Sequence, residues 1–310
     1  MLDDAALPPA LGGATPRASR RAALRARLRD PDPLLLPGVF DALTAAMAEQ
    51  SSFEGVYVTG AGIANTQLGV PDVGLVSFDT VLTQTMRIVA ATTVPTVVDI
   101  DTGFGGPISA MHVVRALGSI GVAAVQIEDQ EMPKRCGHFD GKALASTAEM
   151  QRRVAAAVNA RIDDDFLIIA RTDAVAVEGF ESAIRRAKAY REAGADVLFV
   201  EAPTTVEQIR AIPQELAGVP LLMNVVQGGR TPELSMRELG ELGYKIVLHA
   251  NIVMRAMAHA GLRALRYLRD AGTSDDAVVP ILSWQQRQEL VHLAEFDKLE
   301  DRLAQTWVDK

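Results

Sequence analysis

Short apolar runs alternate with amphipathic stretches along most of this chain, and this alternation restricts the available folds more than any other feature. The runs are almost continuously apolar, as expected for strands whose two faces are both buried. Strands that alternate with helices at this spacing predict βα units and a parallel sheet. The predicted strands cover residues 37–40, 55–60, 93–101, 122–129, 165–173, 195–203, 219–225 and 244–250.

Two architectures can hold such a sheet, a closed (β/α)8 barrel and an open doubly wound sheet. No G-x-G-x-x-G motif opens a helix after a strand, and GFGGP at 103–107 lacks that spacing. Polar residues end nearly every run, and only in a barrel do such ends meet at one mouth. We therefore predict an α/β fold, a TIM barrel with extra C-terminal helices. The polar strand ends are Tyr57, Thr59, Asp99, Asp101, Glu128, Asp129, Arg171, Asp173, Glu201, Asn224 and His249.

The remainder of the chain divides into two flanking segments. Residues 1–30 read as a loose arm followed by a short basic helix, residues 31–272 as the barrel, and residues 273–310 as a helical tail that we expect to pack on a neighbouring subunit. The net charge of −8 argues against nucleic acid or an anionic membrane as partner. A single cysteine and the lack of any apolar run near the ~20 residues of a membrane span predict a cytoplasmic protein.

Asp99 and Asp101 are the most informative of the strand ends. They lie two residues apart, so on a strand they point to the same side. Paired carboxylates at a barrel mouth suit a hard cation such as Mg²⁺, which prefers oxygen ligands and keeps several waters. The alternative is that they are solvated or cap the next helix. Glu128 and Glu201 at equivalent strand ends favour the cation.

Arg171 stands inside the strongly apolar run that ends ARTDA. A buried guanidinium without a partner is costly, so this side chain must pair with acids or with an anionic ligand. Its planar fork matches a carboxylate. The sequence therefore indicates either a substrate-carboxylate site or a structural salt bridge to Asp173 or Glu201.

Cys136, the only cysteine, lies in the segment KRCGH (134–138), eight residues after Glu128. This spacing predicts a loop over the same mouth. A free thiol has a pKa of about 8.5, and the neighbouring Lys134, Arg135 and His138 would lower it and make the thiol an effective proton donor. One Cys and one His two residues apart do not make a zinc site. A role as core filler is unfavourable beside these charges, and a surface bystander is the remaining alternative.

Together with KRCGH, the segments VVDIDTGFGGP, QIEDQ, ARTDA and NVVQGGRTP resemble the motifs of the isocitrate lyase/phosphoenolpyruvate mutase superfamily, in the same order and at similar spacing. The similarity runs from about Leu36 to Arg266. KRCGH resembles the signature of the carbon–carbon lyase branch, which includes methylisocitrate and 2,3-dimethylmalate lyases. The resemblance implies a helix-swapped barrel, commonly a homotetramer, with Mg²⁺ or Mn²⁺ and a 2-hydroxy di- or tricarboxylate substrate.

The resemblance also implies roles for individual residues, matched motif by motif. The metal would be held directly or through water by Asp72, Asp99, Asp101 and Glu128. A mobile gate would contain Lys134, Cys136, Gly137 and His138. The keto-acid half of the substrate would meet Tyr57, Thr59, Gly60 and Ala61, and the rest of the pocket would include Arg171, Glu201, Asn224 and Arg255.

The implied reaction is a retro-aldol (retro-Claisen) cleavage to an α-keto acid, pyruvate or glyoxylate, and a second carboxylate. Cys136 would protonate the carbanion, and Tyr57 is a candidate for the base. Thr59 stands where serine is common, and NVVQGGRTP and LHANIV (248–253) depart from methylisocitrate lyases. NVVQGGRTP looks more like the group that contains dimethylmalate lyase and oxaloacetate hydrolase. An oxaloacetate hydrolase or decarboxylase is therefore the alternative, followed by a phosphonate-processing enzyme and a carboxylate-binding barrel without turnover.

Overall fold

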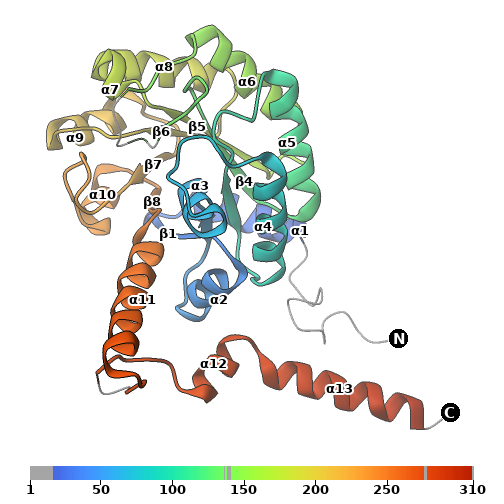
Figure 1. The fold of residues 1–310 in the computed structure, drawn as a ribbon. Helices are drawn as coiled ribbons and strands as arrows, with labels where there is room; N and C mark the ends of the chain where they lie inside the picture. The colour runs from blue at the N-terminus through green and yellow to red at the C-terminus, as the bar shows by residue number, and fades with distance from the viewer. Residues whose placement is uncertain (1–16, 136, 138–140, 276–277, 309–310) are drawn as a thin grey trace.

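The computed structural model describes residues 17–135, 137, 141–275 and 278–308. Its eight strands are all parallel and form a closed barrel in sequence order, so the predicted fold is confirmed (Figure 1). Most of the strands are short, and each ends at the mouth where the polar residues were expected. The strands are β1 (Leu34–Val39), β2 (Val56–Val58), β3 (Thr96–Asp99), β4 (Ala124–Glu128), β5 (Leu167–Thr172), β6 (Val197–Val200), β7 (Leu221–Asn224) and β8 (Ile246–His249).

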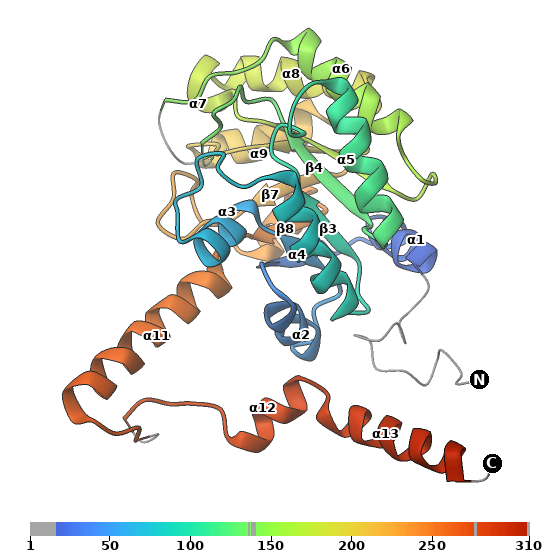
Figure 2. The ribbon, with the colours of Figure 1, turned by 45° about the vertical axis from the view of Figure 1, so that its right-hand side comes forward.

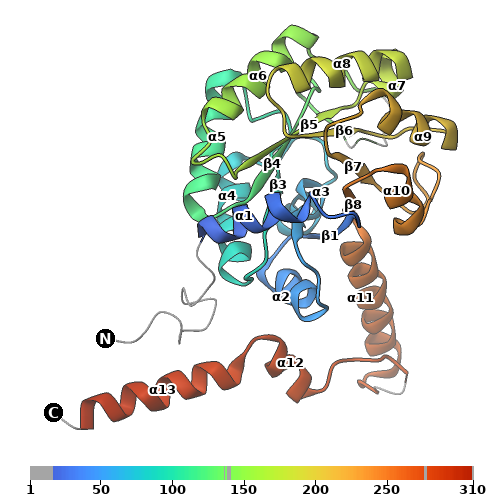
Figure 3. The same cartoon turned by 180° about the vertical axis from the view of Figure 1, so that it is seen from behind.

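Helices surround the barrel, and α1 (Arg17–Arg27) covers the end opposite the mouth. Leu24 of α1 and the following Leu28 pack among the side chains inside the barrel, so α1 covers the N-terminal ends of the strands (Figure 3). The helices between strands are α2 (Ala42–Gln50), α3 (Gly60–Ile63), α4 (Phe78–Ala90), α5 (Pro107–Ile120), α6 (Thr147–Asn159), α7 (Val175–Glu178), α8 (Phe180–Glu192), α9 (Val206–Glu215) and α10 (Met236–Leu242).

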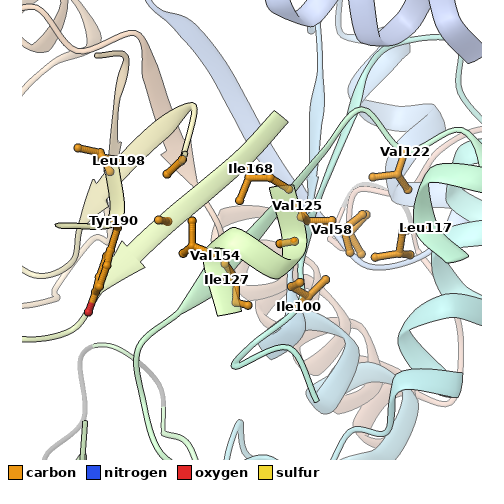
Figure 4. Packing of buried hydrophobic residues seen from close by; sticks show 14 of the residues in the cluster. Val58, Ile100, Leu117, Val122, Val125, Ile127, Val154, Ile168, Tyr190 and Leu198 are labelled. Atoms are coloured by element: carbon orange, nitrogen blue, oxygen red, sulfur yellow. The ribbon is translucent and has the colours of Figure 1, made fainter. Parts of the chain in front are cut away.

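Alternation along the strands decides which side chains reach the site. On β4, Val125 and Ile127 face outward into the layer between strands and helices, where they pack with residues such as Leu117 and Val154 (Figure 4). The period of two therefore turns the intervening residues of β4 into the barrel, including Glu128 at its end. On β5, the same alternation places Ile168 in the layer between the strands and the helices and directs Arg171 into the barrel.

Three local predictions were wrong or incomplete. The first strand was predicted to begin at residue 37, but β1 begins at Leu34 and pairs with β8 from Leu34 onward. A short α3 and a π-helix, η3 (Ala64–Leu68), follow β2 without having been predicted. The tail is two helices, α12 (Trp284–Leu290) and α13 (Leu293–Val308), because the chain turns at His292, whose φ is +58°.

The long helix α11 (Ile252–Ala271) leaves the barrel instead of packing along it. The chain then turns back, so that α12 lies beneath α2 and contacts it (Figures 1 and 2). No residue of α11 is buried, and Leu262, Leu265 and Leu268 are among its exposed apolar side chains. Among the described residues, no helix combines the length and the apolar character that crossing a membrane requires.

Candidate active site

A cavity opens at the C-terminal ends of the strands, where TIM barrels carry their catalytic residues. Eleven of the residues singled out from the sequence line it, contributed by six strands and the loops that follow them. The lining comprises Tyr57, Thr59, Ala61, Asp72, Asp99, Glu128, Lys134, Arg135, Gly137, Arg171, Phe199, Glu201, Asn224, Leu248, Ala250 and Asn251.

The acids after β3 form one side of this cavity. Asp101 has a positive φ of 49°, and its backbone N–H donates to Asp99 Oδ1 at 3.1 Å, so a tight turn holds the two carboxyl groups together. Gly60 lies beside both acids, since a Cβ there would be 3.4 Å from Asp99 Oδ2 and 3.5 Å from Asp101 Oδ1, which are ordinary contact distances.

Lys134 enters this acidic cluster from the loop after β4. Its ammonium contacts Asp72 and lies 2.7 Å from Asp101 Oδ1, and its side chain is almost fully buried. Burial works against the charge, but Asp101 and Asp72 outweigh it and raise the pKa of Lys134. The lysine thus stays protonated and balances part of the negative charge.

The remaining charge still favours a cation. Burial and the neighbouring Asp101 raise the pKa of Asp99 to about 7. Burial likewise raises the pKa of Glu128, and its buried Oε1 accepts no hydrogen bond. Among the described residues, no group of three or more Asp, Glu, His or Cys side chains is placed to hold a metal ion without other ligands. Mg²⁺ commonly binds one or two carboxylates and keeps its waters, so this donor set fits that ion.

Arg171 faces the acids from β5. Its Nε and Nη2 donate to the two oxygens of Asp173 at 2.9 and 3.0 Å, and its Nη1 lies 3.3 Å from Glu128 Oε2. Glu201 lies 3.8 Å away, so the structure shows the ion pairs with Asp173 and Glu201 that were the alternative to a substrate-carboxylate site, and the substrate role stays a prediction. The guanidinium also lies over the Phe199 ring, 5.3 Å from its centroid. These contacts fix a cationic fork at the cavity wall.

Tyr57 does not fit the role of base suggested for it. Its hydroxyl donates to Gln126 Oε1 at 2.5 Å across the barrel. Burial, followed by the charge of Asp99, raises its pKa well above the usual value for a phenol. A phenolate is therefore unfavourable here, and the hydroxyl is suited to orienting groups in the cavity.

Two gate residues and one pocket residue are not placed in the cavity by the structure. Cys136 and His138 lie outside the described residues. Arg255, at the start of α11, is exposed and donates to Gln227 O at 2.8 Å, and it is not among the described residues that line the cavity.

Several site residues escaped the sequence analysis. Gln126 and Phe199 look like ordinary members of buried strands, and Asn251 follows β8 without a motif. Asp129 was noted only as a polar strand end, yet it accepts hydrogen bonds from Thr172 Oγ1, Tyr190 Oη and the Asp173 backbone N–H. The motif QIEDQ contained the signal for Asp129, because a second acid in a buried strand end needs partners.

Comparison with known proteins agrees with this geometry. Residues 24–269 match the family described as phosphoenolpyruvate phosphomutase. The chain belongs to this family. It is 42% identical over 281 residues to the 2-methylisocitrate lyase of Shewanella oneidensis, covering 91% of this chain and 95% of that protein.

Solved structures also match most of the chain. An oxaloacetate acetylhydrolase bound to 3,3-difluorooxalacetate matches with a TM-score of 0.87 at 33% identity, over 92% of this chain and 97% of that one. A 2,3-dimethylmalate lyase matches with a TM-score of 0.86 at 35% identity, over 92% of this chain and 95% of that one. A phosphonopyruvate hydrolase with oxalate and Mg²⁺ matches with a TM-score of 0.82 at 30% identity, over 91% of this chain and 98% of that one.

Proposed function

We propose that the protein is a Mg²⁺-dependent carbon–carbon lyase that cleaves a 2-hydroxy di- or tricarboxylate of the methylisocitrate or dimethylmalate type. The products would be an α-keto acid, pyruvate or glyoxylate, and a second carboxylate. The observation that carries this proposal is the cavity itself. In it the Arg171 guanidinium faces a cluster of carboxylates, and the crowding of these buried acids raises the pKa of Asp99. Relatives named as 2-methylisocitrate lyase and 2,3-dimethylmalate lyase support the same reaction class.

The chain's own residues supply binding and proton transfer. Arg171 would bind a substrate carboxylate through Nη1, the part of its guanidinium that lies 3.3 Å from Glu128 Oε2 and does not contact Asp173. Asp99 would hold Mg²⁺, with Asp72, Asp101 and Glu128 acting directly or through water, and Mn²⁺ is an alternative ion. When bound, the ion polarises the oxygens of the keto-acid half as a Lewis acid. Thr59, Gly60 and Ala61 would grip that half.

Proton delivery falls to the loop after β4. A base takes the proton of the substrate 2-hydroxyl, and the freed electron pair forms the keto C=O bond as the C–C bond breaks. The electron pair of the C–C bond stays on the second fragment, and Cys136 Sγ would donate a proton to that carbon. Lys134, Gly137 and His138 would accompany the thiol as a gate that excludes water. Gly137 supports this assignment, because it already lies at the cavity wall beside Arg171 and Glu201. Asn224 would contact the second fragment, and the sequence motif supports the same for Arg255.

The assembly and compartment are part of the same proposal. The exposed apolar side chains of α11, which leaves its own barrel, support a helix-swapped homotetramer, in which the tail packs on a neighbouring subunit. The single cysteine supports a reducing, cytoplasmic environment. We propose small carboxylates, and neither nucleic acid nor membrane, as partners.

The test is a substrate panel. Purified protein with Mg²⁺ is given 2-methylisocitrate, isocitrate, 2,3-dimethylmalate and oxaloacetate, and the keto acid or oxalate formed is identified. Oxaloacetate hydrolysis is the second candidate, favoured by the similarity to oxaloacetate acetylhydrolase. A lyase releases pyruvate or glyoxylate from a 2-hydroxy acid, whereas oxalate and acetate from oxaloacetate would select the hydrolase.

A Cys136→Ala variant separates these chemistries further. Removing a general acid costs about 10²- to 10⁴-fold in rate, so cleavage should fall by that amount while substrate binding remains. Unchanged turnover in the variant would contradict the role of the thiol.

A further inference from the structure

The two neighbouring acids of the segment QIEDQ face opposite sides of the barrel wall. Glu128 lines the cavity, whereas Asp129 does not, as the period of two along a strand predicts. Asp129 is fully buried, and its partner Tyr190 of α8 lies in the layer between strands and helices (Figure 4). Asp129 is therefore a buried carboxylate behind the cavity wall.

Asp129 binds the end of the neighbouring strand β5 with both of its carboxylate oxygens. Oδ1 accepts from the Asp173 backbone N–H at 2.9 Å, and Oδ2 accepts from Thr172 Oγ1 at 2.6 Å. The backbone register of β4 and β5 ends just before these residues, with Glu128 opposite Arg171. The Asp129 side chain thus continues the connection between the two strands beyond their last backbone pair.

Helix α8 holds the same carboxylate from outside the barrel. Tyr190 Oη donates to Asp129 Oδ2 at 2.7 Å, and Arg186 Nη1 lies 3.5 Å from that oxygen. Arg186 Nη1 also donates to Tyr190 Oη at 3.2 Å and to Ala145 O at 2.9 Å. The two α8 residues are four apart and share one face of the helix, so a regular element fixes the position of the carboxylate.

Asp173 connects this network to the cavity. Its own carboxylate accepts from Arg171 Nε and Nη2 at 2.9 and 3.0 Å. Lys142, which the sequence analysis did not single out, donates to Asp173 Oδ1 at 2.9 Å. Because Asp129 holds the backbone N–H of Asp173, it determines where this carboxylate meets the guanidinium.

We propose that Asp129 is a positioning residue that fixes the end of β5 and, through Asp173, the orientation of the Arg171 guanidinium in the cavity. A binding group keeps one orientation when the residues behind it are themselves held by packing and hydrogen bonds. The inference rests on the proposed function only for the binding of a substrate carboxylate by Arg171.

A purely structural role for Asp129 would predict something different. Loss of its hydrogen bonds would then lower the free energy of unfolding, and Arg171 would keep its position in the native state. The Arg171 Nε–H separates the two cases without substrate. It donates to Asp173 in a buried site, so it should exchange slowly with water as long as this pair is intact.

The experiment measures by NMR how fast the Arg171 Nε–H exchanges with water, in protein that carries isotope-labelled arginine, with Arg171→Lys to assign the signal. We expect exchange in Asp129→Asn to be about tenfold faster than in wild type, the change that corresponds to loss of one charge-assisted hydrogen bond. Arg21→Met is the matched control. It removes a buried ion pair with Asp163 at the opposite end of the barrel, so exchange at Arg171 should stay unchanged.

Equal exchange rates in Asp129→Asn and wild type would overturn the proposal. Equal acceleration in Asp129→Asn and Arg21→Met would also overturn it, because exchange would then follow the loss of stability alone.

If Asp129→Asn does not fold, as judged by circular dichroism, Thr172→Val answers the same question. Valine keeps the shape of the side chain but cannot donate to Asp129, so exchange should be several-fold faster than in wild type. Thr172→Ser keeps the hydroxyl and should retain slow exchange; a wild-type rate in Thr172→Val would contradict the proposal. Because the assay uses no substrate, a failure of the lyase proposal would appear only in the substrate panel and not here.

Discussion

The two ends of the barrel both carry many charges, but they use them differently. At the N-terminal end, the arginines of α1 pair with separate acids: Arg21 Nε with Asp163 at 2.7 Å, and Arg25 Nη2 with Asp196 at 3.0 Å. At the mouth, Asp99 and Asp101 stand side by side and burial raises the pKa of each. The charges at the base lie in ion pairs between arginines and acids, whereas at the mouth two acids are held against each other.

This difference separates stability from function within one domain. Paired charges at the closed end attach α1 beneath the strands and stabilise the fold. The crowded acids at the mouth are unfavourable for the isolated chain, and such sites persist where a ligand compensates them. Substitutions at the two ends should therefore have opposite consequences.

The largest effect is expected from Asp99→Asn. The amide keeps the shape but loses the charge that would hold the cation, so lyase activity should fall about a thousandfold, equivalent to ~4 kcal/mol of lost transition-state stabilisation. The midpoint of thermal unfolding, Tm, should stay the same or rise, because a buried like-charge contact with Asp101 is removed. Steady-state kinetics and calorimetry measure both. A lowered Tm with retained activity would contradict the claim that Asp99 serves function and not stability.

Arg21→Met at the base should give the opposite pattern. Its side chain is 6% exposed, and its loss removes the contacts with Asp163. We expect a decrease of about 1 to 3 kcal/mol in the free energy of unfolding, measured in urea, with kcat/KM unchanged. Arg237→Met, which removes an exposed pair with Glu241, is the control and should cost less than about 0.5 kcal/mol. Loss of activity in Arg21→Met without loss of stability would break the distinction.

A smaller effect should appear in the pH dependence of stability in the presence of a chelator. The pKa of Asp99 is about 7 in the folded chain and 3.8 in the reference state, so the folded state binds more protons between these values. Stability from this group is therefore present at low pH and is lost as pH rises from about 4 to about 7. Wild type should lose stability relative to Asp99→Asn over this window. If the free energies of unfolding of wild type and Asp99→Asn changed with pH in parallel, the pKa of Asp99 would not be raised in the folded state.

Much of the fold and the site could be predicted from sequence because both rest on local patterns. The alternation of apolar strands and helices specified the barrel, and acids or arginines at strand ends specified the mouth. For Arg171 the need of a buried guanidinium for partners left two alternatives, a substrate carboxylate or an ion pair with Asp173 or Glu201, and the structure shows the ion pairs.

What could not be predicted depends on contacts between distant segments. Lys142 follows a glycine in a polar loop and resembles a solvated lysine, and only the return of the loop to the barrel buries it. The bond between Tyr57 and Gln126 depends on how β2 and β4 lie across the barrel. The start of β1 at Leu34, three residues before the predicted strand, depends on pairing with β8.

The most direct test of the central claim, that the crowded acids of the mouth exist to hold a divalent cation, is the Tm of wild type and Asp99→Asn during titration with Mg²⁺ at pH 8. Ligand at 100 times its Kd stabilises by about 2.7 kcal/mol, so wild type should show a rise of several degrees that saturates, and Asp99→Asn should show none. An unchanged Tm in wild type, or an equal rise in the variant, would contradict the account.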